Sequence, residues 1–331
     1  MLDNLPRIPL GFFPTPIHPL PNLSARLGGS ALWVKRDDQT GLATGGNKTR
    51  KLEFLVAEAL RQQADTLITV GAPQSNHARQ TAAAAAKAGL KSALVLRGAP
   101  PPDRTGNILL DDLVGAETFW AGARPLDEVA AEVEAELRAR GKRPYIIPLG
   151  GSNPIGATGY AAAMLEFIEQ SKAMGVHFDT IVFATSSGGT QSGLVLGARL
   201  SGFAGRYADR ILGISVDHRA DYLTPLLVDL ANATAAYIGE SARFAATDFE
   251  VNDDYLGGGY AVLGEPEREA IRLCAQTEGL LVDPVYTGRA MAGLIDLILR
   301  GEFKAGQNVL FWHTGGLPAL FAYAEQLTSA Q

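Results

Sequence analysis

Cysteine, dense positive charge and long apolar runs are scarce or absent in this chain of 331 residues. The single cysteine, Cys274, excludes an intramolecular disulfide framework and a zinc site built on cysteines. It lies in the helical pattern EREAIRLCAQTEG, where we expect a small buried apolar side chain rather than a nucleophile. The formal net charge is −6 and no run of Lys or Arg stands out, which argues against a nucleic-acid or anionic-membrane surface.

Targeting and metal signals are also absent from the sequence. The amino-terminal residues MLDNLPRIPLGFFPTPIHPLPNL are punctuated by prolines and lack the basic start and apolar core of a signal peptide. No stretch is apolar for long enough to cross a bilayer. Metal-ligand spacing does not occur among the five histidines, which are His18, His77, His177, His218 and His313. The sequence therefore predicts a cytoplasmic, soluble protein without a metal site, a membrane or a nucleic-acid partner.

Short apolar runs alternate with longer helical patterns along almost the whole chain. Residues 66–71, TLITVG, are typical of a buried strand, and residues 76–89, NHARQTAAAAAKAG, of the helix that follows it. Further strands are expected at 31–38, 92–98, 117–122, 144–151, 180–189, 210–217 and 308–316, and further helices at 47–63, 107–115, 127–142, 190–202 and 317–327. The alternation predicts an α/β fold with parallel-type sheets covered by helices. The length favours two domains, and the absence of a Gly/Ser linker indicates that they pack closely.

The clearest ligand signal is the turn in TIVFATSSGGTQSG, where an apolar strand leads directly into a helix. The turn consists of Ser186, Ser187, Gly188, Gly189 and Thr190. Small residues let backbone N–H groups surround an anion, hydroxyls add donors, and the helix start adds a positive field. The turn is not a P-loop, because no Lys follows the second glycine, and it is not the dinucleotide fingerprint. It fits one phosphate monoester, although a plain strand–helix turn remains an alternative.

Two further turns place polar residues between a strand and a helix. These residues are Ser75, Asn76 and His77 in GAPQSNHARQ, and Tyr286 in DPVYTGRAMAG, with Thr314 in the HTGG that ends the last strand. Strand ends that face helix starts are where α/β sheets bind ligands. The first group either caps its helix or supplies donors for a substrate carboxylate. The tyrosine and the threonine are either structural or part of the same site.

The stretch TGGNKTRKLEFL places Lys48, Arg50 and Lys51 in the first turns of a helix, where the helix dipole favours acidic residues. They are either solvated surface charges or part of a chemical site. A phosphate monoester, a lysine and no metal together indicate pyridoxal phosphate, whose aldehyde forms a Schiff base with a lysine. Such a lysine must lose its proton, and neighbouring cations lower the pKa of an amine. We therefore expect Arg50, Lys51 and the helix start to disfavour the ammonium form of Lys48.

Five motifs resemble one known family, and they occur in order along the chain: TGGNKTRKLEFL, GAPQSNHARQ, SSGGT, LLVDPVYTGRAMAGLID and FWHTGGLPALFAY. They are similar to the 1-aminocyclopropane-1-carboxylate deaminase and D-cysteine desulfhydrase family of pyridoxal phosphate enzymes. The resemblance covers essentially the whole chain. It implies the two-domain fold of the tryptophan synthase β type, called fold type II, a small amino-acid substrate and a homodimer. The larger domain would comprise residues 1–50 and 161–331, and the smaller inserted domain residues 51–160.

The resemblance also implies roles for individual residues. Lys48 would carry the cofactor, residues 186–190 would form its phosphate cup, and Lys51 would assist at the phosphate. Asn76 would contact the ring hydroxyl of the cofactor and, with Ser75 and His77, line the substrate site. Tyr260 and Tyr286 would face the substrate as a pair. The expected catalytic residues are therefore Lys48, Ser75, Tyr260 and Tyr286.

Two positions separate the branches of this family. The ring-opening deaminases carry Glu directly after the DPVY tyrosine and Leu at the HTGG threonine, whereas this chain has Thr287 and Thr314, the desulfhydrase pattern. A carboxylate beside the pyridine nitrogen keeps the ring protonated and a strong electron sink, whereas threonine only hydrogen-bonds to it. The resemblance therefore favours α,β-elimination, with Lys48 as the base at Cα. D-cysteine would give pyruvate, hydrogen sulfide and ammonia.

Other functions fit the same motifs. L-cysteate sulfo-lyase, which releases sulfite, shares GGNKTRKLEFL, SNHARQ and HTGG, but its segment after DPVY differs from TGRAMAG. A 1-aminocyclopropane-1-carboxylate deaminase is a less favoured member of the same family. A non-catalytic protein that binds pyridoxal phosphate or an amino acid is an alternative from another class, because a fold alone does not fix a function. The substrate's chirality stays open, and the loop RGAPPPDRTGN is shorter than in typical desulfhydrases, so the mouth of the site is expected to differ.

Overall fold

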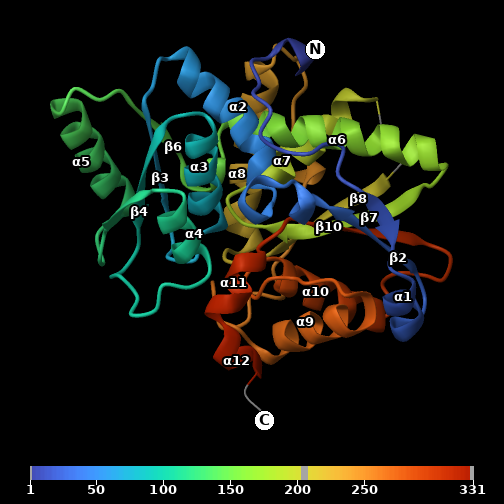
Figure 1. Cartoon of the computed structure of the whole chain (residues 1–331). Coiled ribbons are helices and arrows are strands. Elements are labelled where there is room, and N and C mark those ends of the chain that lie inside the picture. Colours follow the sequence, from blue (N-terminus) through green and yellow to red (C-terminus); the bar gives the residue numbers. More distant parts are fainter. Residues whose placement is uncertain (1, 203–207, 329–331) are drawn as a thin grey trace.

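Two β-sheets organise the chain in a computed structural model, which describes residues 2–202 and 208–328 (Figure 1). The larger sheet has the strand order β1-β2-β10-β7-β8-β9, and the smaller sheet the order β5-β4-β3-β6. The pairing of β1 with β2 is antiparallel, and the pairings of the other neighbouring strands are parallel. The α/β fold with parallel-type sheets is thereby confirmed.

The strands are β1 (Ile17–Pro19), β2 (Ala31–Arg36), β3 (Thr66–Gly71), β4 (Lys91–Leu96), β5 (Glu117–Trp120), β6 (Pro144–Ile147), β7 (Phe178–Thr185), β8 (Ala208–Ser215), β9 (Glu250–Asn252) and β10 (Asn308–His313). The helices are α1 (Pro21–Leu27), α2 (Lys48–Arg61), α3 (Asn76–Lys87), α4 (Asn107–Leu113), α5 (Leu126–Ala139), α6 (Pro154–Met174), α7 (Gly189–Leu200), α8 (Ala220–Tyr237), α9 (Glu265–Glu278), α10 (Thr287–Leu299), α11 (Leu317–Ala322) and α12 (Ala324–Thr328). Each expected strand and helix overlaps one of these elements.

Strand β7 shows why the strands of the larger sheet appear in the sequence as continuous apolar runs. Val182 and Ala184 pack into the core shared with α9 and α10, whereas Ile181 and Phe183 pack into the core shared with α6 and α7. Alternate side chains of a strand point to opposite faces, so a strand covered on both faces needs apolar residues at every position. Cys274 lies in the first of these cores, fully buried, as the sequence predicts. Figure 1 shows the two helix pairs on opposite sides of this sheet.

The smaller sheet is also covered on both faces. Helix α5 packs its Val129 and Val133 on one face, and α2, α3 and α4 cover the other. Helix α3 contributes only alanines to the apolar cores on this face, namely Ala78, Ala82, Ala84 and Ala85, and these small side chains let the helix lie close to the strands. Because α3 begins directly after β3, its first turn stands at the carboxyl end of the strands.

The sequence patterns predicted neither of the long helices α8 and α6, and α6 shows a physical reason. Its first turns contain Gly156 and Gly159, which weaken a helical pattern. A Cβ atom on Gly159 would lie only 2.3 Å from the carbonyl oxygen of Arg50, so glycine is needed where α6 crosses α2. The expected domain boundaries at 50/51 and 160/161 fall inside these two helices, and the division into domains stays a proposal.

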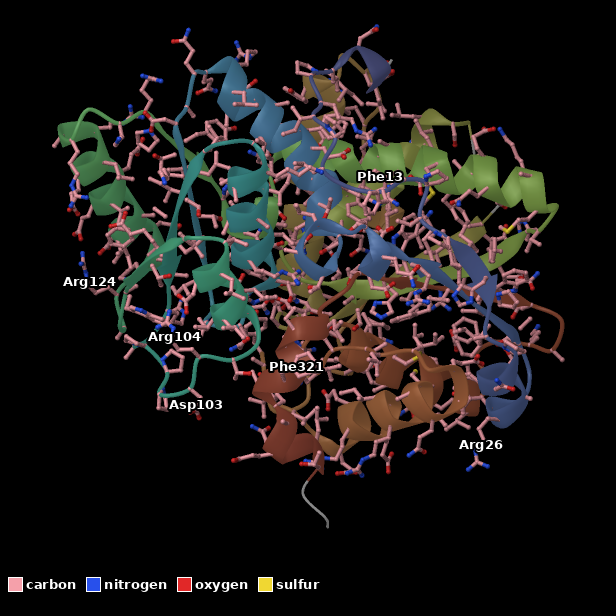
Figure 2. All side chains as sticks on the ribbon, in the orientation of Figure 1. Phe13, Arg26, Asp103, Arg104, Arg124 and Phe321 are labelled. Carbon is pink, nitrogen blue, oxygen red and sulfur yellow. The ribbon has the colours of Figure 1, made fainter. Side chains whose placement is uncertain are left out.

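The proline-rich loop between β4 and α4 ends against α11. A Cβ atom on Gly106 would lie 2.8 Å from the carbonyl oxygen of Pro318, which shows how closely the loop end approaches the first turn of α11. Asp103 and Arg104 lie at the outer part of the loop (Figure 2). Within the described residues, no helix is both long and apolar enough to cross a membrane.

Candidate active site

A cavity of about 300 Å³ is lined by the carboxyl ends of strands from both sheets. The predicted site residues in its lining are Lys48, Lys51, Ser75, Asn76, His77, Ser186, Ser187, Gly188, Thr190, Tyr260, Tyr286 and Thr314. Two predicted residues, Gly189 and Thr287, do not line it. Motifs that lie more than 200 residues apart in the sequence therefore meet in one cavity, at the strand ends where α/β sheets bind ligands.

Lys48 is the first residue of α2 and is half-buried in the cavity wall. Its Nζ donates to Asn47 Oδ1 at 3.0 Å and lies 6.0 Å from the centre of the Tyr286 ring. Burial, and then the positive charge of Arg79, lower the pKa of Lys48 to about 8, while Asp283 acts in the opposite direction. The amine therefore loses its proton far more readily than an exposed lysine does.

Arg50 does not play the part that the sequence suggested. Its guanidinium donates to Asp37 at 2.8 Å and to Glu166 at 2.9 Å, so its charge is neutralised away from the cavity. The cation that acts on Lys48 is Arg79 of α3, whose guanidinium donates to the carbonyl oxygen of Gly45 at 2.9 Å. Arg79 is 31 positions from Lys48, and no local pattern links the two.

The turn at the start of α7 forms a cradle for an anion. Ser187 Oγ lies 2.8 Å from Ser152 Oγ, which also accepts from the backbone N–H of Gly189 at 3.2 Å. Lys51 Nζ donates to the same serine at 3.2 Å, and a Cβ atom on Gly189 would lie 2.7 Å from that Nζ. Burial and the charge of Lys48 hold the pKa of Lys51 well below its usual value, so a bound anion would stabilise its ammonium form.

Ser152 is a member of this cradle that the sequence analysis missed. It follows Gly150 and Gly151, and this GGS stretch at the end of a strand was the available signal. Ser186 differs from the other predicted phosphate-binding residues, because its hydroxyl is already used: it donates to Asp217 Oδ2 at 2.6 Å. The hydroxyls nearest the helix start are thus those of Ser187, Ser152 and Thr190.

The start of α3 forms a second polar wall. Ser75 Oγ accepts from the backbone N–H of Ala78 at 3.1 Å, so the serine is the N-cap of α3. Capping uses the oxygen as an acceptor and leaves the hydroxyl hydrogen for a ligand, so both of the roles considered for Ser75 are compatible. His77 Nε2 lies 2.8 Å from Thr69 Oγ1, and burial holds the pKa of His77 well below its usual value. Its ring is therefore neutral at neutral pH.

Tyr260 and Tyr286 lie together, with their hydroxyl oxygens 2.6 Å apart. Burial raises the pKa of Tyr260 to about 12 and holds that of Tyr286 well above its usual value. Both phenols keep their protons at neutral pH, and one hydrogen serves the bond between them. The other hydroxyl hydrogen is left for a ligand in the cavity, which makes the pair a hydrogen-bond donor rather than a base.

Thr287 and Thr314, the two residues that separate the branches of the family, have different surroundings. Thr314 lines the cavity, and its carbonyl oxygen accepts from the backbone N–H of Asn47 at 2.9 Å. Thr287 Oγ1 donates to Asp283 Oδ1 at 2.7 Å and accepts from the backbone N–H of Asp283, also at 2.7 Å. These bonds hold the turn before α10, and a contact of Thr287 with the cofactor stays a prediction.

The sequence patterns did not mark three ionisable residues of the cavity lining. Arg97 follows β4, and Asp217 and His218 follow β8. One oxygen of the Asp217 carboxylate is buried without a hydrogen-bond partner, and burial raises the pKa of this group. Their positions at the ends of the predicted strands 92–98 and 210–217 were the available signal, since the carboxyl ends of parallel strands meet at one edge.

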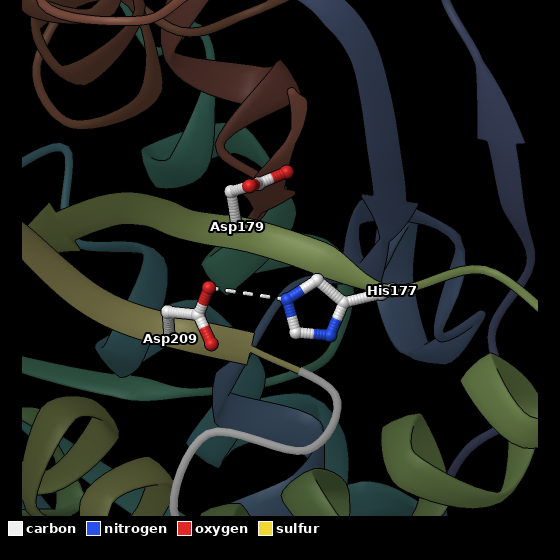
Figure 3. A group of neighbouring side chains, drawn as sticks. All are labelled: His177, Asp179 and Asp209. Carbon is white, nitrogen blue, oxygen red and sulfur yellow. Dashed lines mark hydrogen bonds and ion pairs between the residues drawn. The ribbon is translucent and has the colours of Figure 1, made fainter. Parts of the chain in front are cut away.

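A second group of polar residues lies at the opposite end of β7 and β8 (Figure 3). His177, Asp179 and Asp209 bring ligand-type atoms within 4.8 Å of one another, although they show no metal-ligand spacing in the sequence. His177 Nε2 lies 3.2 Å from Asp209 Oδ2, and Asp179 accepts from the backbone N–H of Asn308 at 2.7 Å. We interpret these contacts as an ion pair and a strand-end hydrogen bond, and the absence of a metal site stays a prediction.

Comparison with known proteins connects this cavity with a cofactor. A family described as pyridoxal-phosphate dependent enzymes matches residues 8–315. A D-cysteine desulfhydrase of Klebsiella pneumoniae is 45% identical over 337 residues, which cover 98% of each chain. A 1-aminocyclopropane-1-carboxylate deaminase of Burkholderia vietnamiensis is 43% identical over 338 residues, again 98% of each chain.

Solved structures support the same connection. A structure described as an ACC deaminase homologue has a TM-score of 0.89 at 42% identity and covers 98% of this chain and 96% of its own. The processed form of threonine deaminase isoform 2 from Solanum lycopersicum has a TM-score of 0.65 at 18% identity. It covers 95% of this chain and 82% of its own. At that identity the second likeness shows the fold alone.

The fold and the cavity define an enzyme of fold type II that depends on pyridoxal phosphate. The residues present fit this cofactor, because a half-buried lysine of lowered pKa shares one cavity with an anion cradle at a helix start. The chain belongs to the 1-aminocyclopropane-1-carboxylate deaminase and D-cysteine desulfhydrase family of these enzymes.

Proposed function

We propose that this enzyme catalyses α,β-elimination from a small amino acid, with D-cysteine as substrate. One water is consumed, and pyruvate, hydrogen sulfide and ammonia are released. The observation that carries the proposal is that Lys48 and the Tyr260–Tyr286 pair line the same cavity. A base and a hydrogen-bond donor are thereby available on the two sides of one small ligand.

Lys48, Lys51 and the start of α7 would hold the cofactor. Bound pyridoxal phosphate supplies the electron sink that makes the Cα proton of an amino acid acidic. Lys48 Nζ accepts that proton, and a pKa near 8 leaves a useful share of the amine neutral. Asn76 would contact the cofactor ring, and its Oδ1 is oriented by a bond of 3.1 Å from Asn107 Nδ2.

The remaining groups orient the substrate. The hydroxyl hydrogen of Ser75 and the start of α3 favour a carboxylate, because a helix N-terminus offers N–H groups and a positive field. The free hydroxyl hydrogen of the tyrosine pair donates to the departing sulfur. Thr314, at a position where the deaminases carry Leu, supports elimination rather than ring opening.

L-cysteate is the second candidate substrate, with sulfite as the leaving group. Arg97 in the cavity lining favours it, because a guanidinium pairs well with a sulfonate. Asp217 opposes it, because its carboxylate, when ionised, repels a second anion in the same cavity. An Arg97→Gln variant should lose activity on L-cysteate and keep activity on D-cysteine.

The deciding experiment measures pyruvate, sulfide and sulfite from D- and L-cysteine, L-cysteate and 1-aminocyclopropane-1-carboxylate, for which 2-oxobutanoate replaces pyruvate. Sulfide from D-cysteine alone supports the proposal. Sulfite from L-cysteate, or 2-oxobutanoate from the cyclopropane, would replace it by one of the alternatives. A protein that binds the cofactor at Lys48 and turns over none of the four would instead be a binding protein.

We also propose a cytoplasmic homodimer with the two domains given above. Symmetric dimers are the most frequent oligomers of soluble enzymes, which supports the dimer. Light scattering of the purified holoenzyme checks it, and a monomer at micromolar concentration would contradict it.

A further inference from the structure

The turn that carries Tyr260 has two backbone hydrogen bonds of its own, from the N–H of Gly259 to the carbonyl oxygen of Leu256 at 3.1 Å and from the N–H of Val262 to that of Gly259 at 3.3 Å. Gly257, Gly258 and Gly259 precede the tyrosine, and glycines lose the most conformational freedom when a chain folds. Gly259 has a φ of 109°, and Ala261, just after the tyrosine, has a φ of 62°, which is unfavourable for a residue with a Cβ atom. Two internal hydrogen bonds and three glycines leave this turn dependent on contacts with other segments for a fixed position.

Two side chains supply such contacts at three carbonyl oxygens of the turn. Arg289 of α10 donates to the carbonyl oxygens of Gly259 at 2.9 Å and Val262 at 2.8 Å, one on each side of the tyrosine. The hydroxyl of Tyr323 donates to the carbonyl oxygen of Ala261 at 2.7 Å. The backbone around Tyr260 is thus held from outside at both ends.

Arg289 is itself fixed by its surroundings. It is buried, and its Nε donates to Glu267 Oε1 at 2.6 Å. Its Nη1 also donates to the carbonyl oxygen of Val216 at 2.9 Å, directly before the cavity residue Asp217. A planar guanidinium with several fixed donors can join these segments, whereas the single ammonium of a lysine cannot reach all of them.

We propose that Arg289 is a positioning residue that holds the Tyr260 turn so that the hydroxyl of Tyr260 meets that of Tyr286. Arg289 lies three residues after Tyr286 in α10, so one short stretch carries one tyrosine and fixes the other. Tyr323 assists from the carboxyl-terminal segment. The part of this proposal that concerns turnover rests on the proposed function, whereas the order of the turn does not.

The test compares two tyrosine variants with the arginine variant. Tyr323→Phe removes one hydrogen bond to the turn and keeps the ring. The matched control is Tyr255→Phe, which removes a bond of 2.6 Å to Asp296, also on α10, and touches none of the three carbonyl oxygens. Arg289→Lys keeps the positive charge beside Glu267 and shortens its reach.

Two measurements are made on each holoenzyme. With D-cysteine, kcat should fall about 100-fold in Arg289→Lys and about fivefold in Tyr323→Phe, and change less than about twofold in Tyr255→Phe. KM and the bound cofactor should change little. Amide hydrogen exchange at residues 258–262 should become faster in the first two variants and stay unchanged in the control.

Equal loss of kcat in the two tyrosine variants would overturn the positioning role, and so would unchanged exchange in Tyr323→Phe. If Arg289→Lys does not fold, Tyr323→Phe and its control still decide the question. If the wild type turns over none of the substrates while exchange behaves as expected, the proposed function fails and the positioning role stands.

Discussion

The three cations in the first turn of helix α2, which are Lys48, Arg50 and Lys51, lie in two very different surroundings. Arg50 belongs to a network that contains two carboxylates, Asp37 and Glu166, and its guanidinium lies 4.4 Å from the centre of the Phe13 ring. Lys48 and Lys51 face the cavity, where no carboxylate pairs with either ammonium among the described residues. Arg50 and Lys51 are both buried although they lie in different surroundings, and Lys48 is half-buried, so burial alone does not distinguish the two places.

The pKa values show what the difference means. In the Arg50 network, pairing holds the pKa of Asp37 below its usual value and raises that of Arg50, so both groups stay charged. In the cavity, burial lowers the pKa values of Lys48 and Lys51, because a buried charge without a partner is costly. A balanced network stabilises a fold, whereas an unbalanced group of cations is suited to an anionic ligand and to a neutral amine.

The largest effect is expected from Lys48→Ala. Because a positioned base contributes about 10²–10⁴-fold, turnover should fall by about that factor, while the cofactor still binds through its phosphate. Borohydride reduction of the wild-type holoenzyme, followed by peptide mapping, should place the cofactor on Lys48. A label on Lys51 would show that the roles of the two lysines are reversed.

The second prediction concerns the balanced network. Asp37→Asn removes a carboxylate that accepts from Arg50, from the Tyr160 hydroxyl at 2.6 Å and from Trp312 Nε1 at 2.8 Å. The charge of buried Arg50 is then only partly compensated, and such a charge is costly. The free energy of unfolding should therefore fall by about 3 kcal/mol, measured by chemical denaturation of the apoprotein.

The control for that variant is Asp112→Asn, which breaks a half-exposed pair with Arg104 and should cost at most about 1 kcal/mol. If the two variants lose equal stability, the network around Arg50 is no more important than a surface ion pair.

These contrasts also show what the sequence predicts and what it does not. Strand β3 has the residues predicted for it, and the SSGGT and SNH turns lie at the cavity, because turns at strand ends are encoded by neighbouring residues. The partners of the cations are not encoded locally. Glu166 is 116 positions from Arg50, so the direction in which Arg50 points depends on how α6 packs against α2.

Side chains that look ordinary in the sequence were missed for a related reason. Arg97 follows a strand in a proline-rich loop, and Asp217 and His218 follow a strand in a stretch without glycine. Nothing in their neighbourhoods marks a ligand site, and they reach the cavity only because parallel strands end at one edge. Polar residues at strand ends are therefore candidate ligand-binding residues even where no glycine-rich turn follows.

The third prediction sharpens the contrast within α2. Lys51→Met removes a cation that has hydrogen bonds of 3.0 Å to the carbonyl oxygen of Gly150 and 3.2 Å to Ser152 Oγ. The apoprotein should be as stable as the wild type or more so, because an unpaired buried ammonium is costly. Cofactor affinity should fall by about 1.5–3 kcal/mol, roughly 10- to 150-fold, measured by fluorescence titration of the apoprotein.

Lys87→Met is the matched control, because Lys87 Nζ donates to the carbonyl oxygen of Leu10 outside the cavity. Its cofactor affinity should equal that of the wild type. A Lys51 variant that loses stability and keeps its affinity would mean that Lys51 belongs to the fold rather than to the phosphate site.

The smallest effect concerns the pH profile, which tests whether Arg79 acts on Lys48 through its charge. Asp283 faces Lys48 as an opposing charge, and Lys51, His77 and Tyr286 are the other titratable neighbours.

Since Arg79 disfavours the ammonium form, its removal raises the pKa of Lys48, and a base with a higher pKa becomes active only at higher pH. The amine of Lys48 is free only once the substrate has displaced it from the cofactor, so its pKa governs kcat; in Arg79→Gln the acidic limb of kcat should therefore move upward by roughly one pH unit from its position near pH 8. Arg79→Lys keeps the charge and should leave the limb in place, even if losing the bond to Gly45 lowers activity throughout. Equal shifts in both variants would mean that Arg79 acts by holding the loop before Lys48, and the low pKa of this lysine would then follow from burial alone.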